Sequence, residues 1–251
     1  MNFAELPDDW PDQRDALHLV AAHVLANAQK QMNGHFALMP LPGGFGTPQY
    51  GPDRLRLRVA GGSLFVERVD GERDGEAAAT TETVPIAGSS IRQLCALADV
   101  EPDPDLWIGE DTPDLGDPDA PIALDSITST LVGDWFALGQ RAMDAAVASL
   151  PDARSTIARL WPEHFDVGLD LAVDAALKPG TRCNLGAAAG DSFHPEPYLY
   201  VGPWDSARPG PESFWNAPFG ATLGFGDLDV SENPLQAAGE FFLTGIAHLR
   251  S

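Results

Sequence analysis

One segment in the first third of the chain constrains the fold most strongly. The residues RLRLRVA at 54–60 alternate between charged and apolar side chains, Gly61-Gly62 follows, and SLFVERV comes next. Alternation with a period of two places side chains on opposite faces of a strand, and a Gly-Gly pair suits the tight turn between hairpin strands. We therefore predict a β-hairpin whose inward side chains are Leu55, Leu57 and Val59.

Helical periodicity appears at four other places. Residues 11–33 carry apolar positions at the i, i+3, i+4, i+7 spacing of an amphipathic helix, and Asn33-Gly34 supplies a stop. Ser89 or Ser90 can cap a helix that runs to Ala98, and Asp125 can cap a long helix that runs to about residue 149. A further helix is expected from Pro234 to about Leu249.

The remaining segments complete an α+β fold. We predict a third strand in TETVPI at 81–86, a loop in the charged run at 70–79 and a helix led by Pro151. Further strands are expected near 165–173, 181–187, 197–203 and 219–225. The expected architecture is an antiparallel or mixed sheet packed with long helices.

The predicted domain organisation has two helix-plus-sheet halves. Residues 1–100 form the first half and residues 125–251 the second, while the Pro- and Asp-rich segment at 101–124 forms a solvated connector. In each half a helix precedes a His-Phe pair, strands separated by Gly-rich loops and a closing helix. The halves can be repeats of one unit, or the chain can form one compact domain in which this similarity is a coincidence.

The charge limits the classes of partner. The chain has 37 acidic and 15 basic residues and a net charge of −22, which repels nucleic acid and anionic membranes. High-GC coding bias and adaptation to high salt would both explain the acidity. The acidic N-terminal sequence and the lack of a long apolar stretch indicate a cytoplasmic protein. Cys95 and Cys183 are expected to be small buried hydrophobic residues rather than reactive thiols.

Four ionisable residues in the second half form a candidate metal site. His164 with Asp166, and His194 with Glu196, are two residues apart, so in extended backbone each pair lies on one face. Imidazole and carboxylate ligands suit zinc, manganese or iron. The same groups can act without a metal, with His194 or His164 as a general base and Glu196 orienting its ring, or they can serve only as structural hydrogen-bonding groups.

Aromatic residues concentrate between 193 and 225. Tyr198, Tyr200 and Trp204 are the predicted ligand-binding residues, and together with their aromatic neighbours they can line a pocket for a planar or sugar-like ligand. The same cluster can instead be the packed face of a sheet, or a partner surface such as a homodimer interface.

Two glycine-rich segments lack the context of nucleotide-binding motifs. GGFGTPQYG at 43–51 leads to a proline and a strand rather than to a helix, and GAAAGD at 186–191 has no Lys-Ser or Lys-Thr pair. We expect Asp191 to bond nearby backbone amides in a turn.

The segments WPEHFD, NLGAAAGDSFHPEPYLYVGPW and FWNAPFGA resemble a family of bacterial proteins of unknown function that is common in high-GC genomes. The resemblance covers roughly residues 155–230, and GGFGTPQYG is also similar to such proteins. It implies that the second half is a unit and assigns no reaction or residue role.

Two functions follow from these features. The first is a small-molecule-binding protein, as a metal-assisted or acid/base enzyme with its site in the second half. The alternative is a non-catalytic binding or interaction protein that uses the aromatic residues at 193–225.

Overall fold

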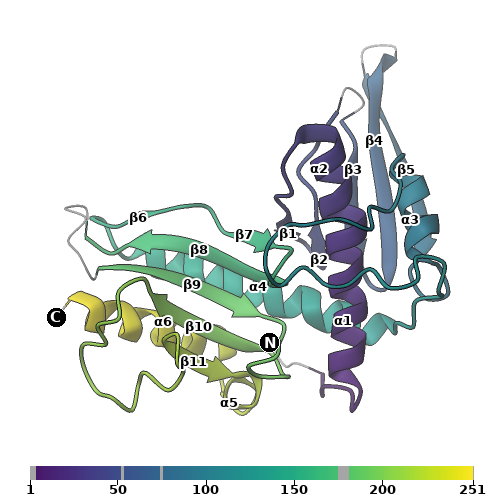
Figure 1. Cartoon of the computed structure of the whole chain (residues 1–251). Helices are drawn as coiled ribbons and strands as arrows, with labels where there is room; N and C mark the ends of the chain where they lie inside the picture. The colour runs from purple at the N-terminus through teal and green to yellow at the C-terminus, as the bar shows by residue number, and fades with distance from the viewer. Residues whose placement is uncertain (1–3, 52–53, 74–75, 175–180, 251) are drawn as a thin grey trace. The chain divides into compact units, whose positions relative to one another are not determined.

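The computed structural model describes residues 4–51, 54–73, 76–174 and 181–250 and has the predicted α+β class, with two antiparallel sheets and long helices (Figure 1). The chain divides into two compact units. The N-terminal unit contains Glu5–Asp134 together with Leu160–Phe165, and the C-terminal unit contains Trp135–Arg159 together with Asp166–Ser251.

A five-stranded sheet forms the β-layer of the N-terminal unit. Its strands follow chain order, and every neighbouring pair is antiparallel. They are β1 (Met39–Leu41), β2 (Gly44–Gly46), β3 (Arg56–Ala60), β4 (Ser63–Arg73) and β5 (Glu76–Pro85). The predicted hairpin is confirmed in β3 and β4, and Leu55, Leu57 and Val59 are all buried.

Helices of the N-terminal unit begin and end where the sequence indicates. The first is one 24-residue run of α1 (Trp10–Val20), the π-helical turn η1 (Ala21–Ala26) and α2 (Asn27–Asn33), and Gly34 ends it at a φ of 72°. The second is α3 (Ile91–Leu97). The Ser90 hydroxyl accepts from the Gln93 amide at 3.3 Å, and the Gln93 side chain bonds back to Ser90, which completes a capping box.

The C-terminal unit contains most of an antiparallel sheet in the order β11-β10-β9-β8-β6, to which β7 adds a sixth strand. The strands are β6 (Arg154–Ser155), β7 (Arg159–Trp161), β8 (Asp166–Ala172), β9 (Arg182–Ala188), β10 (Tyr198–Pro203) and β11 (Ala221–Gly224). The four strands predicted between residues 165 and 225 are therefore confirmed as β8 to β11, with small differences at their ends.

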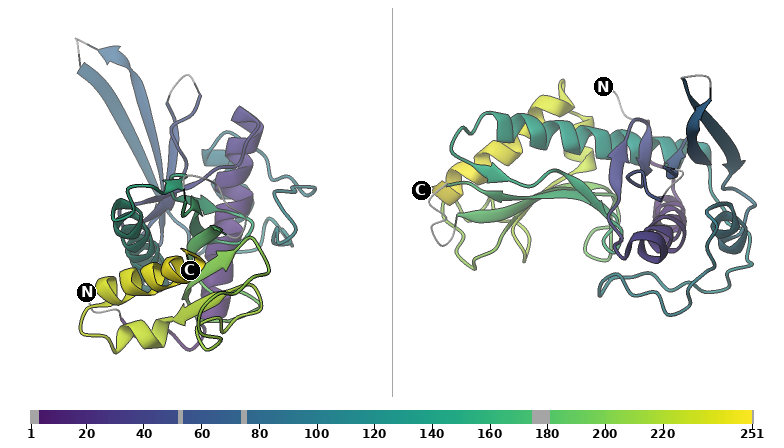
Figure 2. Two further views of the ribbon diagram at one scale, coloured as in Figure 1. Left: turned by 90° about the vertical axis from the view of Figure 1, so that its left-hand side faces the viewer. Right: turned by 90° about the horizontal axis from the view of Figure 1, so that it is seen from above.

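Helices cover one face of this sheet, as the right-hand view of Figure 2 shows for α4 (Ser126–Ala148) and α6 (Pro234–Arg250). Gly139 on α4 and Gly245 on α6 allow these helices to approach the sheet closely. A Cβ atom at Gly139 would lie 2.3 Å from the Ala187 Cβ, and one at Gly245 would lie 2.9 Å from Val201. The short helix α5 (Phe225–Asp229) connects β11 to α6. The predicted Asp125 cap is also present, since the Thr128 amide donates to Asp125 Oδ1 at 2.6 Å.

Two local predictions were wrong. The charged run at 70–79 is not a loop, because β4 continues to Arg73 and β5 begins at Glu76. The charge of this run suggested a solvated loop, but charged side chains do not prevent the backbone from pairing in a sheet. Pro151 does not begin a helix. The chain makes a turn there and enters β6, which pairs with β8 through Arg154 and Ala172.

The connector lacks regular secondary structure at 101–121, as predicted, but it is not simply a solvated loop. Leu106, Ile108 and Leu115 are buried among the residues of the N-terminal unit. These three apolar side chains hold the acidic segment against the rest of the unit. A Pro- and Asp-rich segment can therefore form one wall of a cleft. Among the described residues, no helix has the length and apolar character needed to cross a membrane.

Candidate functional site

Asp166 is a buried carboxylate at the beginning of β8. One of its oxygens accepts a hydrogen bond of 2.5 Å from the Tyr200 hydroxyl, and Tyr200 lies on β10, within the same unit. Burial, and next the negative charge of Asp166, raise the pKa of Tyr200 far above its usual value. Asp166 is thus engaged with a neutral phenol.

A second pair of tyrosine and aspartate lies beside the first. The Tyr198 hydroxyl donates to Asp191 Oδ2 at 2.6 Å, and the rings of Tyr198 and Tyr200 are 6.3 Å apart. Asp191 Oδ1 accepts from the amides of Phe193 and His194 at 2.8 and 3.0 Å, which confirms the predicted turn. The geometry of Tyr198 is therefore set by the turn that precedes it.

The other predicted metal and acid/base residues lie in different surroundings. The His164 ring bonds Asp111 at 2.9 Å, and both residues belong to the N-terminal unit, whereas Asp166 belongs to the C-terminal unit. The His194 ring lies 6.0 Å from that of Tyr198, and Glu196 is exposed. Over the described parts of the chain, no group of three or more His, Cys, Asp or Glu side chains could hold a metal ion, and the metal and acid/base roles stay predictions.

Trp204, the third predicted ligand-binding residue, is 58% exposed. The Arg182 guanidinium lies 3.6 Å from the centre of its ring, and its indole nitrogen donates to Asn184 Oδ1 at 2.9 Å. The side chain is therefore both exposed and held in place.

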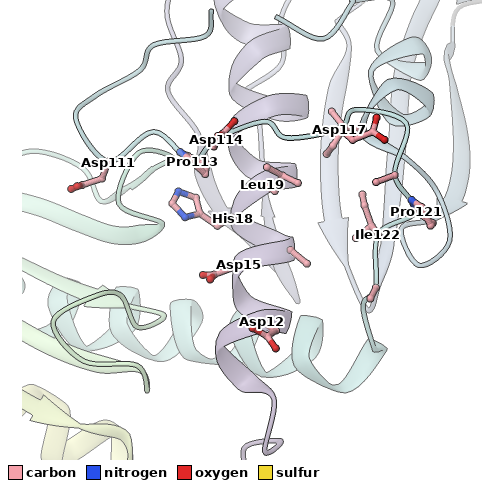
Figure 3. A pocket seen from close by; sticks show the side chains of 14 residues that line it. Asp12, Asp15, His18, Leu19, Asp111, Pro113, Asp114, Asp117, Pro121 and Ile122 are labelled. Carbon is pink, nitrogen blue, oxygen red and sulfur yellow. The ribbon is translucent and has the colours of Figure 1, made fainter. Parts of the chain in front are cut away.

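A cleft of about 570 Å³ in the N-terminal unit was not predicted (Figure 3). It lies between α1, the first residue of α3 and the connector, all of which belong to this unit. Apolar residues form much of its wall: Ala16, Leu19, Ile91, Pro113, Ala120, Pro121, Ile122 and Ala123. Its size falls within the range of ordinary small-molecule pockets.

The acidic side chains of the cleft come from the two segments that supply most of its lining. Asp12 and Asp15 lie on α1, and Asp111, Asp114 and Asp117 lie on the connector (Figure 3). Lysine and arginine are absent from the described lining residues. A basic neighbour, Arg14, does reach one of these carboxylates, at 2.7 Å from Asp15 Oδ1. The lining nevertheless keeps a strong excess of negative charge.

The other ionisable group of the lining is His18, and its environment keeps it neutral. Its Nε2 lies 2.8 Å from the Pro162 carbonyl, and its ring stacks on Phe165 at 5.3 Å with 9° between the planes. Burial lowers its pKa from 6.5 to about 4. Because a carbonyl can only accept, Nε2 carries the proton, and Nδ1 of the neutral ring is an acceptor.

A turn at 162–165 supports this end of the cleft. Phe165 adopts a φ of 52°, an uncommon value for a residue other than glycine, and its ring also meets Phe45 edge-on at 5.3 Å. Next to it, His164 bonds the lining residue Asp111, and burial raises the pKa of Glu163. The turn thus fixes one cleft carboxylate and the stacking surface under His18.

The sequence contained a weak signal for the cleft. Asp12 and Asp15 are three residues apart on a helix, and Asp111, Asp114 and Asp117 repeat the same spacing on the connector. Such a pattern is also typical of a solvated surface, and the pairing of two segments about 100 residues apart is a product of the fold.

Comparisons with known proteins identify no relative. No protein-family model, no curated protein and no solved structure matches this chain.

Proposed function

We propose that the chain binds a small organic cation, a protonated amine or a guanidinium on an apolar body, in the cleft between α1 and the connector. The observation that carries the proposal is the composition of the lining, whose polar side chains are hydrogen-bond acceptors. These are five aspartates and the neutral imidazole of His18. A ligand that fits them must supply donors and positive charge.

The apolar part of the lining favours an organic ligand over a bare metal ion. Leu19, Ile91 and Ile122 offer surface on which a hydrocarbon or aromatic body can be desolvated. A hydrated metal ion would gain nothing from these side chains, and the described residues contain no set of donors that could hold one. An amine with an alkyl or aryl group would use both parts of the cleft.

The state of His18 supports the same ligand class. A charged imidazolium would repel a cation, whereas burial keeps this ring neutral at pH values well above 4. Its hydrogen bond to the Pro162 carbonyl fixes the tautomer. The ring can therefore present Nδ1 as an acceptor beside the carboxylates.

Electrostatics adds to both affinity and encounter rate. A charge pair 4 Å apart contributes about 1 kcal/mol in water and about 4 kcal/mol at the effective dielectric constant near a protein surface. The net charge of −22 attracts a cation over a longer range, and salt screens that attraction. Binding should therefore weaken as the ionic strength rises.

The test uses probes matched in shape and different in charge. Tryptamine and its alcohol analogue tryptophol, and phenethylamine and 2-phenylethanol, are titrated into the protein by calorimetry at low ionic strength and pH 7. We expect each amine to bind at least about tenfold more tightly than its alcohol, which corresponds to about 1.4 kcal/mol. Equal affinity within each pair, or no binding of either amine, would contradict the proposal.

Matched variants locate the binding site. Asp15→Asn removes one charge from the cleft, and Asp105→Asn removes one charge from an exposed connector residue outside the lining. Both change the net charge by the same amount. A cleft ligand should lose several-fold affinity with the first and little with the second, whereas equal losses would indicate attraction by the overall charge alone.

A further inference from the structure

The C-terminal unit carries a second surface that the cleft does not involve. Tyr198, Tyr200 and Trp204 are separated by even numbers of residues, so they lie on one face of β10 and its extension. The opposite face, which includes Val201, packs against α6 at Gly245. Helices α4 and α6 both lie on that opposite face of the sheet, as the right-hand view of Figure 2 shows. The alternation of side chains along β10 therefore places the aromatic residues on the other face.

Three large aromatic residues of this unit keep much of their surface in solvent. Trp204 is 58% exposed, Phe193 is 44% exposed and Phe219 is 37% exposed. The rings of Phe193 and Phe219 are 5.0 Å apart, and that of Phe219 is 6.3 Å from the Tyr200 ring. The grouping of Phe193, Phe219 and Tyr200 differs from the isolated exposed apolar residues that occur on any protein surface.

Polar contacts hold Trp204 in a single orientation. The Arg182 guanidinium covers one face of its ring at 3.6 Å, and Asn184 accepts from its indole nitrogen at 2.9 Å. Arg182 is in turn fixed by Asp170, with a distance of 2.9 Å between Nε and Oδ1. Because the residue is nevertheless 58% exposed, much of its surface is available to a ligand while these contacts pre-organise the ring for stacking.

Gly202 leaves space between the two aromatic side chains that flank it. A Cβ atom at this position would have its nearest neighbour, the Phe219 carbonyl oxygen, at 3.9 Å. Tyr200 and Trp204 are four residues apart, which corresponds to about 13 Å along a strand. That span matches two or three linked sugar rings better than one.

The charges of this surface indicate an uncharged ligand. The guanidinium of Arg182 is paired with the carboxylate of Asp170, so the two charges beside Trp204 compensate each other. The net charge of −22 repels nucleotides, sulfated sugars and uronic acids, which could otherwise stack on the same ring. Sugars present apolar C–H faces to aromatic rings and hydroxyl groups to planar polar side chains, and this surface offers both partners.

We propose that this face of β9 and β10, with Trp204 as its stacking residue and Arg182, Asp170 and Asn184 as its polar edge, binds a neutral oligosaccharide. The terminal rings of the ligand lie on Trp204 and on the exposed ring of Phe219, which packs against Tyr200. The central part lies over Gly202. This site is independent of the amine-binding cleft.

The test is calorimetric titration of the full chain with neutral hexasaccharides: cellohexaose, maltohexaose, xylohexaose, mannohexaose and chitohexaose. We expect at least one to bind saturably, and Trp204→Ala to weaken it at least tenfold. Arg182→Lys keeps the charge and loses the planar stack, so it should also weaken binding. Gly202→Val fills the space above the strand and should have a similar effect, while Trp107→Ala, which removes an exposed tryptophan of the N-terminal unit, should have none.

Several results would overturn the proposal. These are the absence of binding across the panel, binding that both Trp204→Ala and Gly202→Val leave unchanged, and self-association in sedimentation that Trp204→Ala abolishes while no sugar binds. Circular dichroism of each variant separates loss of fold from loss of the surface. Amine titrations on the same variants distinguish this proposal from the cleft proposal, because amine affinity should be unaffected.

Discussion

Acid should destabilise the protein through His18, and the amount follows from its burial. The ring has a pKa of about 4 in the folded chain and 6.5 when solvated. Between pH 4 and pH 6.5 the unfolded chain therefore binds a proton at this ring and the folded chain does not. The stability contributed by the neutral ring is complete above about pH 6.5 and is lost as the pH falls toward 4. The difference between the two pKa values corresponds to about 3 kcal/mol.

The variant His18→Gln isolates this contribution, because glutamine cannot titrate and its amide can still donate to the Pro162 carbonyl. Urea unfolding of both proteins is followed by tryptophan fluorescence at intervals from pH 8 to pH 4. We expect the wild type to lose about 3 kcal/mol more than the variant over this range. Other groups, including His23, whose pKa burial also lowers, contribute equally to both curves.

Parallel curves would contradict this prediction, because they would mean that the pKa of His18 is the same in the folded and unfolded chains. A wild-type curve that falls less steeply than that of the variant would mean that folding raises the pKa of His18, so that the ring would be a cation beside the cleft carboxylates.

Three further predictions concern the packing of the C-terminal unit and a helix cap, each measured as a change in unfolding free energy. Gly139→Ala should cost about 1–3 kcal/mol, because the new methyl group meets the Ala187 Cβ at 2.3 Å, and Ala187→Gly in the same chain should restore much of the loss. Trp135→Phe should cost about 1–3 kcal/mol, because the indole nitrogen donates to the Ala188 carbonyl at 2.7 Å and both groups are buried. Ser90→Ala should cost about 1 kcal/mol by removing the cap of α3.

Each of these expectations has a distinct contrary result. If the changes in unfolding free energy caused by Gly139→Ala and Ala187→Gly simply add in the double variant, α4 and the sheet do not meet at that contact. A neutral Trp135→Phe variant would mean that water satisfies the Ala188 carbonyl, and a neutral Ser90→Ala variant would mean that α3 begins elsewhere.

Local patterns in the sequence predicted most of the secondary structure. The alternation at 54–60 identified β3, and Asp125 and Ser90 identified helix starts, because these signals depend on residues close together in the chain. Pro234 also marked a helix start correctly, since α6 begins there, whereas the predictions from the charged run and from Pro151 were wrong. Backbone pairing continued through 70–73 and 76–79, and tertiary packing placed Pro151 in a turn rather than in a helix.

The candidate sites were less accessible from the sequence. Tyr198 and Tyr200 lie on β10, inside the strand predicted at 197–203, and Trp204 directly follows it. Asp166 and Asp191 proved to be the partners of the two tyrosines. The cleft was missed because its walls come from distant segments. The neutrality of His18 depends on burial, and its tautomer depends on the Pro162 carbonyl; the fold supplies both.

The measurement that tests the central claim most directly is a nitrogen-detected NMR titration of the His18 imidazole with tryptamine at pH 7. We expect that Nε2 carries the proton and that the Nδ1 resonance moves saturably as the amine binds, while tryptophol leaves it unchanged. A proton on Nδ1, or amine binding that leaves both imidazole nitrogens unperturbed, would contradict the assignment of this cleft as the cation site.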